Sequence, residues 1–256
     1  MSGRFVLAQI SDVHIGAAPG RTGADCAAQM RAAFAAAAAY RPDAFVLTGD
    51  LVNDAKPEEY QELAALLDAC AVQAPIYLAP GNHDHRALMR AAFPAHVYLP
   101  DAAHLSYAIE DFPVRLVVLD QIAEGSVFGA LRDDMADWLD ATLSAAPRKP
   151  TIIAMHHPPF LTHDRLFDHI GLHGMERFHA IVAKHPQVQR VICGHHHRAA
   201  TGQVAHAPAM AAPSTAWAFS VSLDPDMDVA QRSPHIGWAL HVWKPDAGFS
   251  SFVMPL

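Results

Sequence analysis

Cysteine is scarce in this sequence, and its three residues of this type, Cys26, Cys70 and Cys193, form no CxxC pair. An odd number of separated cysteines argues against a disulfide framework and against a thiolate zinc site. We therefore expect a reducing compartment. Cys193 ends an apolar run and is expected in the hydrophobic core.

Long apolar runs are also missing. The longest, residues 32–40, is about half of the roughly 20 residues that a membrane-spanning helix needs. The N-terminal segment MSGRFVLAQISD has too short an apolar run for a signal peptide. These features predict a cytoplasmic protein without a membrane partner.

Basic residues are few, with 18 Lys and Arg against 26 Asp and Glu and a net charge of −8. This balance argues against a stable nucleic-acid partner, which needs a basic face. The 52% of hydrophobic and 17% of charged residues instead fit a globular protein. Histidine, in contrast, is as frequent as Lys and Arg together, with 18 residues, which is a first indication of metal chemistry.

Apolar runs of strand length alternate with segments of helical periodicity, which predicts an α/β fold. The expected strands are residues 5–10, 44–48, 75–79, 114–119, 151–155 and 189–193, and the expected helices are residues 24–40, 57–70, 130–145 and 174–185. The strands are apolar throughout, as expected of strands that are covered on both faces. The length suits one domain, residues 1–256.

The chain changes in character at about residue 199. Three expected strands, 218–223, 237–243 and 249–254, follow one another with only short turns. This spacing predicts a β-rich C-terminal portion with antiparallel pairing. These strands could also provide an edge for a homo-oligomer.

Five of the expected strands are followed by polar clusters. The clusters are SDVH at 11–14, TGD at 48–50, PGNHDH at 80–85, HHPP at 156–159 and GHHH at 194–197. Ligands of α/β sheets bind beyond the carboxyl ends of strands, so these clusters can converge on one point. Their mixture of imidazole and oxygen donors suits Fe, Mn, Zn or Co.

In order and type, these five clusters resemble the DxH, GD, GNH[DE], HxP and GHxH pattern of the calcineurin-like metallophosphoesterase superfamily. The segments GDLVNDAKPEEYQEL and PGNHD, and the later APSTAW, resemble its bacterial class III cyclic nucleotide phosphodiesterases and related glycerophosphodiesterases. The resemblance implies a four-layer αββα sandwich of two mixed sheets, whereas periodicity alone indicates only the α/β alternation.

The same resemblance implies a site with two metal ions. Asp12, His14, Asp50 and His197 would hold one ion, and Asp50, Asn82, His156 and His195 would hold the other. His83 would contact the phosphate together with Asn82 and protonate the departing oxygen, a role that imidazole suits near neutral pH.

Residues next to the candidate ligands could have several different roles. Asp84 and Asp120 are candidates for orienting the ligands. His157 is expected to be an exposed loop residue or a pocket wall, and His196 points away from its neighbours in an extended segment. The candidates for substrate contact are Phe160, which offers a stacking face, His163, on the following loop, and His196.

The function implied by the resemblance is hydrolysis of a small phosphodiester, a 3',5'-cyclic nucleotide or a glycerophosphodiester, by a hydroxide held between two metal ions. A phosphomonoesterase or a nuclease on the same core is the alternative within enzymes, and the acidic charge argues against a nuclease. An inactive metal-binding scaffold is a third reading, but all seven ligands and His83 are present.

Overall fold

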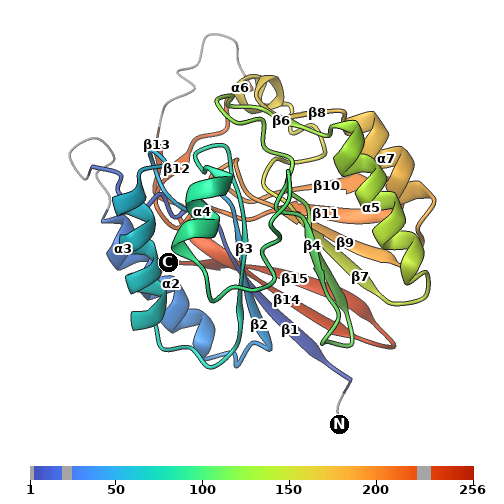
Figure 1. Cartoon of the computed structure of the whole chain (residues 1–256), viewed down its shortest axis with the longest axis horizontal. Helices are drawn as coiled ribbons and strands as arrows, with labels where there is room; N and C mark the ends of the chain where they lie inside the picture. The colour runs from blue at the N-terminus through green and yellow to red at the C-terminus, as the bar shows by residue number, and fades with distance from the viewer. Residues whose placement is uncertain (1–2, 19–24, 224–231) are drawn as a thin grey trace.

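A computed structural model of the chain describes residues 3–18, 25–223 and 232–256 (Figure 1). Its helices are α2 (Cys26–Ala38), α3 (Pro57–Ala69), α4 (Arg86–Ala92), α5 (Asp133–Ala145), α6 (Arg165–His169) and α7 (Met175–Ala183). Its strands before residue 199 are β1 (Phe5–Ile10), β2 (Ala44–Thr48), β3 (Ile76–Ala79), β4 (Tyr107–Ile109), β5 (Arg115–Val118), β6 (Gly129–Ala130), β7 (Thr151–Ala154), β8 (Leu172–His173) and β9 (Val188–Cys193). The later strands are β10 (Ala200–Val204), β11 (Ala207–Ala211), β12 (Ala218–Phe219), β13 (Arg232–Ser233), β14 (Gly237–Lys244) and β15 (Gly248–Pro255).

Two large mixed sheets form the centre of the protein. The first has the order β15-β14-β1-β2-β3, in which β1, β2 and β3 run parallel and the β14–β15 hairpin is antiparallel to β1. The second has the order β10-β11-β9-β7-β5-β4, in which the four middle strands run parallel and both edge strands are antiparallel. Parallel neighbours end at the same side of each sheet, which is why residues from distant parts of the chain can meet there.

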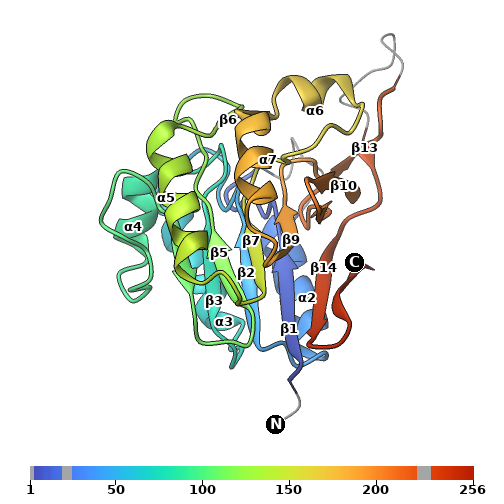
Figure 2. The ribbon, with the colours of Figure 1, turned by 90° about the vertical axis from the view of Figure 1, so that its right-hand side faces the viewer.

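Alternating side chains of the strands divide the core into layers. In β1, Val6 and Ala8 pack with α2 and α3, whereas Phe5 and Leu7 face the second sheet. In β9, Val191 packs with residues of α5 and α7. Figure 1 shows α2 and α3 on the left, α5 and α7 on the right and the sheets between them; in Figure 2, α5 and α7 face the viewer. The four-layer αββα sandwich is therefore confirmed.

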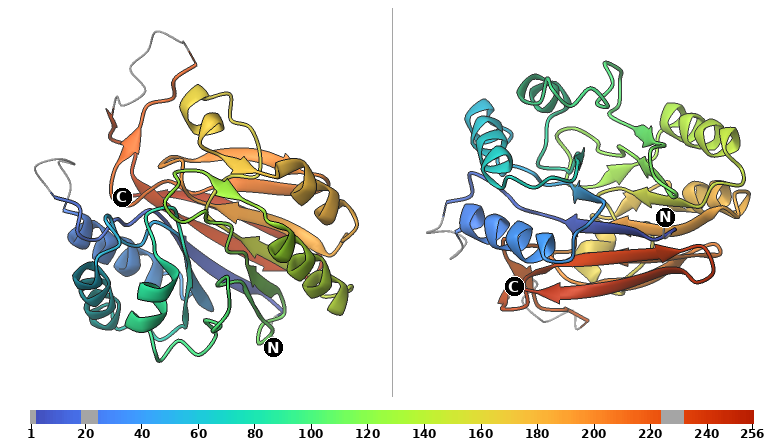
Figure 3. Two further views of the ribbon diagram at one scale, coloured as in Figure 1. Left: turned by 45° about the horizontal axis from the view of Figure 1, so that its top comes forward. Right: turned by 90° about the horizontal axis from the view of Figure 1, so that it is seen from below.

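The C-terminal strands belong to both sheets. β10 and β11 extend the second sheet, while β14 and β15 extend the first and form its edge, drawn in red in Figure 3. The hairpin of β10 and β11 was not expected from the sequence, and the strand expected at 218–223 is only Ala218–Phe219. Phe252 and Val253 of β15 are exposed. Self-association through these strands stays a prediction.

The expected helices and strands of the first 199 residues agree with the structure except at their ends. The helix expected from residue 24 begins at Cys26, and residue 24 itself lies outside the described residues. The short helices α4 and α6 and the strands β4, β6 and β8 were not expected. Within the described ranges, no helix has the length and apolar character required to span a bilayer.

Candidate metal centre

Polar side chains from both sheets meet beyond the ends of five strands. The loops after β1, β2 and β3 belong to one sheet, and those after β7 and β9 belong to the other. Main-chain hydrogen bonds join neighbouring loops: the Asp12 N–H donates to the Gly49 carbonyl at 3.1 Å, and the Gly194 N–H donates to the His156 carbonyl at 2.9 Å. The His83 N–H donates to Asp50 Oδ1 and the His195 N–H to Asp12 Oδ1, so that all five polar clusters lie side by side.

A first group of donor atoms comes from the loops after β1, β2 and β9. The ligand atoms of Asp12, His14, Asp50 and His197 all lie within 4.8 Å of one another, and all four residues are buried. The Nε2 atoms of His14 and His197 are 3.0 Å apart. His14 Nε2 lies 3.6 Å from Asp50 Oδ2, and His197 Nε2 lies 3.6 Å from Asp12 Oδ1.

A second group surrounds the side-chain oxygen of Asn82. This Oδ1 atom lies 3.1 Å from His156 Nε2 and 3.0 Å from His195 Nδ1. The other carboxylate oxygen of Asp50, Oδ1, lies 3.3 Å from His156 Nε2. Asp50 thus faces both groups, one oxygen towards each. A carboxylate can do this because each oxygen has spare lone pairs.

Backbone carbonyls fix the orientation of three of these imidazoles. Thr48 accepts from His156 Nδ1 at 2.8 Å and Trp217 accepts from His197 Nδ1 at 2.8 Å, while the carbonyl of Ile170 lies 3.1 Å from His195 Nε2. When one ring nitrogen donates in this way, the other nitrogen presents its lone pair to the centre. Among the described residues, the remaining His14 Nδ1 is buried without a hydrogen-bond partner.

The spacing of the donor atoms fits two cations. Two atoms that each lie about 2.1 Å from one metal ion are about 3.0 Å apart at a right angle and about 3.4 Å apart at a tetrahedral angle. The separations within the two groups run from 3.0 to 3.6 Å. Lone pairs of ring nitrogens and oxygens facing one another at such distances repel unless a proton or a cation lies between them. The donor set therefore supports a dinuclear metal centre.

The backbone of this centre adopts a conformation that non-glycine residues rarely use. Asp12, His14, Asp50, His195 and His197 have φ angles of 53°, 45°, 49°, 68° and 54°. Each such residue costs of the order of 1–3 kcal/mol and persists where the surroundings enforce it, which happens mostly at functional sites. Five strained residues in one cluster support a functional role for these loops.

Two glycines allow the loops to approach each other. A Cβ atom on Gly81 would lie 2.1 Å from the Asp50 nitrogen, and one on Gly194 would lie 2.0 Å from Ser11 Oγ and 2.8 Å from Asp12 Oδ2. These contacts are far inside van der Waals distance, so no larger residue fits without moving a candidate ligand.

Burial and mutual charge perturb the pKa values of the centre. Burial raises the pKa of Asp12 to about 7 and holds the pKa values of His14 and His195 well below their usual range. Burial also opposes charge on Asp50 and His156. Their mutual attraction outweighs it, so that the pKa of Asp50 lies well below its usual value and that of His156 rises to about 9. Such shifts are typical of sites that concentrate charge away from water.

The two acidic residues that were expected to orient ligands differ in position. Asp84 accepts from Gly81 N at 2.8 Å, from Leu51 N at 3.1 Å and from Tyr60 Oη at 3.1 Å, so it ties together the loops after β2 and β3. Asp120, in contrast, binds the guanidinium of Arg86 through both oxygens, at 2.6 and 2.8 Å. Asp120 therefore holds the first residue of α4 in place and does not orient a candidate metal ligand.

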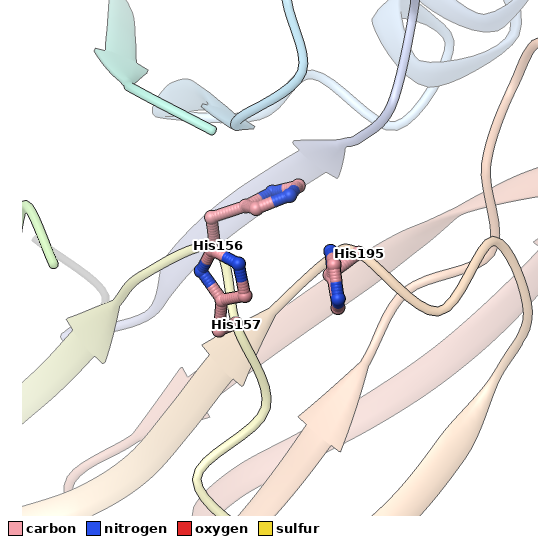
Figure 4. A group of neighbouring side chains, drawn as sticks. All are labelled: His156, His157 and His195. Carbon is pink, nitrogen blue, oxygen red and sulfur yellow. The ribbon is translucent and has the colours of Figure 1, made fainter. Parts of the chain in front are cut away.

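His157 is buried, and the expectation of an exposed loop residue was wrong. Its Nε2 atom donates to the Val127 carbonyl at 3.2 Å, and its Nδ1 atom pairs with the side-chain amide of Gln121 at 3.0 Å. Figure 4 shows His156 and His157 after one strand and His195 after its neighbour, with the ring of His157 beside that of His195. Although it lies within ligand distance of this group, both of its ring nitrogens have protein partners.

His83 lies at the edge of the centre. Its main-chain nitrogen donates to Asp50 Oδ1 at 2.9 Å, and its Nδ1 donates to the Asn53 carbonyl at 2.6 Å. These two bonds fix both the loop and the ring. The Nε2 atom remains available for a substrate.

A cavity of about 190 Å³ opens over the candidate ligands. Its polar side consists of His14, Asp50, Asn82, His83, His195 and His197. Its other side is apolar and consists of Val127, Leu166, Phe167, Ile170, Trp217 and Phe219. The centre therefore has a floor of donor atoms and a hydrophobic wall.

Three residues expected to contact substrate lie elsewhere. Phe160 packs in the core, where a Cβ atom on Gly202 would touch its ring at 2.4 Å. His163 is exposed on the loop before α6. His196 is buried with its Nε2 3.2 Å from Thr162 Oγ1, and its ring packs on Phe167. None of the three belongs to the described residues that line the cavity.

Few sequence features indicate the residues that do form the wall. Phe167 lies on the five-residue helix α6 and Phe219 on the two-residue strand β12, and such short elements have no readable periodicity. Trp217 ends the APSTAW segment, whose resemblance to phosphodiesterases was the one sequence feature that could have indicated a wall residue.

Comparison with known proteins agrees with this architecture. The dimetal phosphatase of Danio rerio superposes with a TM-score of 0.73 at 16% identity and covers 98% of both chains. A 3',5'-cyclic-nucleotide phosphodiesterase of Nostoc is 29% identical over 217 residues, which cover 83% of this chain and 79% of that protein. The glycerophosphodiester phosphodiesterase GpdQ of Enterobacter lignolyticus is 38% identical over 177 residues, which cover 68% of this chain and 63% of that protein.

The sequence model of calcineurin-like phosphoesterases matches residues 5–199, which carry all seven candidate ligands. The chain belongs to the calcineurin-like phosphoesterase family.

Proposed function

We propose that this protein is a metal-dependent phosphodiesterase that hydrolyses small phosphodiesters. Asp12, His14, Asp50 and His197 would hold one metal ion, and Asp50, Asn82, His156 and His195 would hold a second. The observation that carries this proposal is the position of Asp50. One of its carboxylate oxygens faces the first group of donors, and the other oxygen faces the second group.

The chemistry of the donor set limits the metals. Imidazole and oxygen donors together suit Fe, Mn, Zn or Co, and thiolate is missing from both groups. Two such ions, when bound, would supply Lewis acidity and neutralise negative charge on the phosphoryl oxygens.

His83 is placed to act on the leaving group. Because its Nδ1–H donates to the Asn53 carbonyl, a second proton can sit only on Nε2. That proton can be transferred to the departing ester oxygen. The bond from the His83 nitrogen to Asp50 keeps this ring in register with the metal centre.

The charge of the cavity favours diesters over monoesters. Neither lysine nor arginine is among the described residues that line the cavity. The nearby Arg86 and Arg198 are committed to buried ion pairs with Asp120 and Asp164. A dianionic monoester is bound best by extra cationic side chains, whereas a monoanionic diester needs fewer.

The names of the relatives point in the same direction, since one is a glycerophosphodiester phosphodiesterase and another a cyclic-nucleotide phosphodiesterase. These two substrate classes are the ones we propose for this chain.

The test is a comparison of kcat/KM for bis(4-nitrophenyl) phosphate and 4-nitrophenyl phosphate, with each candidate metal added separately to metal-free protein. We expect the diester to be preferred under every metal that supports turnover. A clear preference for the monoester would assign the protein to phosphatases instead, and no metal-dependent turnover would support an inactive scaffold.

A further inference from the structure

The segment after β9 has two faces. His195 and His197 point into the candidate metal centre, where they face Asn82 and His14. The segment is not extended, because His195 and His197 have φ angles of 68° and 54°. The residues between and after them, His196 and Arg198, pair with Thr162 and Asp164 instead. Both contact Phe167, which belongs to the apolar wall of the cavity.

Arg198 joins the two pieces of chain that carry this wall. Its guanidinium forms an ion pair with Asp164, the residue that precedes α6, and lies 5.0 Å from the ring centroid of Phe167. On the other side, its Nη1 donates to the carbonyls of Ser220 at 2.7 Å and Phe219 at 3.2 Å. The side chain is almost entirely buried, so these contacts are made away from water.

Asp164 completes the connection. One oxygen caps α6 by accepting from Leu166 N at 3.2 Å, and the other accepts from Ser222 N at 3.0 Å. A buried ion pair adds little net stability because removing both charges from water is costly. The arrangement is therefore better explained by the positions it imposes on the chain than by the free energy it adds.

The rings that are held in this way lie next to the candidate ligands. The centroids of Phe167 and Phe219 are 5.8 Å apart with an angle of 52° between the planes. Phe167 contacts the ring of His195 edge-on at 5.8 Å, and Phe219 lies 5.2 Å from the ring of His197. Both rings line the cavity over the candidate ligands, so they are within reach of an ester arm of a phosphodiester bound there.

We propose that Phe167 and Phe219 determine specificity by packing against a planar aromatic ring in one ester arm of the substrate, and that Arg198 positions them. This inference rests on the proposed function and narrows its substrate class to diesters that carry an aryl group or a nucleobase.

The composition of the wall supports an aromatic arm over a polyol arm. Its side chains besides the two phenylalanines are Val127, Leu166 and Ile170, which offer no donor or acceptor, and Trp217, whose polar atom is a single indole N–H. The several hydroxyl groups of a glycerol arm would therefore lose most of their hydrogen bonds to water there. A stacked or edge-on aromatic contact, in contrast, strengthens binding by about tenfold.

The first experiment measures binding rather than turnover. Protein reconstituted with Mn²⁺ is titrated by calorimetry with diphenyl phosphate and with diethyl phosphate. We expect diphenyl phosphate to bind about tenfold more tightly, and Phe167→Leu and Phe219→Leu each to remove most of this difference. The matched control is Phe160→Leu, a core substitution near the same loop, which should leave the ratio unchanged. Equal binding of both diesters, or an equal loss for both in the two wall variants, would overturn the inference.

The second experiment tests Arg198 as a positioning residue. Arg198→Lys keeps a cation beside Asp164 but removes the planar fork that reaches Phe219 and Ser220. We expect the ratio of diphenyl to diethyl phosphate binding to fall and KM for bis(4-nitrophenyl) phosphate and for 3',5'-cyclic AMP to rise about fivefold, with kcat near that of the unmodified protein. A rise in KM for one of the two substrates alone would identify its ring, aryl group or nucleobase, as the one that packs against the wall. A lower Tm with an unchanged ratio of diphenyl to diethyl phosphate binding would show a merely structural role.

The two proposals can fail separately. Selective binding of diphenyl phosphate without hydrolysis of any diester would contradict the proposed phosphodiesterase activity but support the proposed role of the aromatic wall. Hydrolysis of glycerophosphoethanolamine at the rate of aromatic diesters would contradict the role of the wall but support the phosphodiesterase activity.

Discussion

The Oδ1 atom of Asp50 lies 3.3 Å from Nε2 of His156, and the same oxygen accepts the main-chain N–H of His83 at 2.9 Å. The other oxygen of Asp50 faces His14. One carboxylate thus links the two donor groups and the proposed proton donor. Removing it should affect all three.

Asp50→Ala should lose both metal equivalents and essentially all activity. Loss of a partner that merely orients a ligand already lowers metal affinity by about 10–100-fold, and loss of a shared ligand should exceed this. Metal content after dialysis, measured by mass spectrometry, tests the prediction, with circular dichroism to show that the fold is kept. The control is Asp54→Ala, which removes an exposed carboxylate nearby. Two tightly bound ions in Asp50→Ala would end the assignment of a shared ligand.

The two proposed sites differ in charge. The first has Asp12 and the shared Asp50, whereas the second has only the shared carboxylate and the neutral amide of Asn82. The second ion should therefore bind more weakly and leave first during chelation. Asn82→Asp should tighten it by about tenfold or more, because a charged ligand attracts a cation more strongly than an amide. Calorimetric titration checks this, and equal affinities in the unmodified protein would contradict it.

His83→Ala should impair esters with poor leaving groups far more than activated aryl esters. General acid catalysis contributes typically about 10²–10⁴-fold, and less when the departing oxygen is a weak base. The measurement is kcat for an alkyl and an aryl diester. The matched control is His85→Ala, two residues away and exposed. Equal losses for both esters would leave His83 as a phosphate-binding residue only.

Gly194→Ala should destabilise the protein because the new Cβ would meet Ser11 Oγ at 2.0 Å and Asp12 Oδ2 at 2.8 Å. Overpacking of this kind costs about 1–3 kcal/mol, and displacement of Asp12 should weaken metal binding as well. The control is Gly125→Ala, where nothing lies within 4 Å of the Cβ position and any cost comes from backbone strain at a φ of 80°. Urea unfolding and metal titration are measured for both variants, and the control should bind metal like the unmodified protein. Unchanged metal binding in Gly194→Ala would contradict a steric displacement of Asp12.

The sequence predicts the parallel strands and the polar clusters after them, because both depend on local composition. β1 and β2 are buried along their whole length, as their apolar runs indicated. That the seven candidate ligands bind metal stays a prediction, although the structure brings them together.

What could not be predicted depends on contacts between distant residues. Beside the wall, Arg198 pairs with Asp164, 34 positions earlier in the chain, and neither residue shows this partner in its local sequence. Phe160 has the same residue type as Phe167 but packs against Gly202 of β10, a strand that was itself missed. Aromatic residues a few positions apart therefore take opposite roles, core and cavity wall, for reasons that only the tertiary structure provides.

A buried polar network connects the two sheets beneath the metal centre. His241 of β14 donates through Nε2 to Gln9 Oε1 at 2.9 Å. Gln9 Nε2 in turn donates to the Cys193 carbonyl at 2.8 Å and to Thr48 Oγ1 at 2.9 Å. The network thus joins four strands at the level where their loops begin. Burial favours the neutral form of His241, in which Nδ1 accepts from Ser251 Oγ at 2.7 Å.

This network predicts a loss of stability in acid. Burial lowers the pKa of His241 to about 3, whereas the unfolded chain has a histidine pKa of about 6.5. Between these values the unfolded chain binds a proton that the folded protein does not, so this contribution to stability is complete above pH 6.5 and is lost as the pH falls towards 3. The free energy of unfolding then falls by up to about 1.4 kcal/mol for each unit of pH.

His241→Gln removes this linkage, so the difference in unfolding free energy between the unmodified protein and the variant should shrink from pH 7 to pH 5. Other acid-sensitive groups cancel because both proteins contain them. The control is Gln203→Asn on β10, which changes no titratable group, so the difference should stay constant. A constant difference for His241→Gln as well would show that His241 takes up a proton in the folded protein.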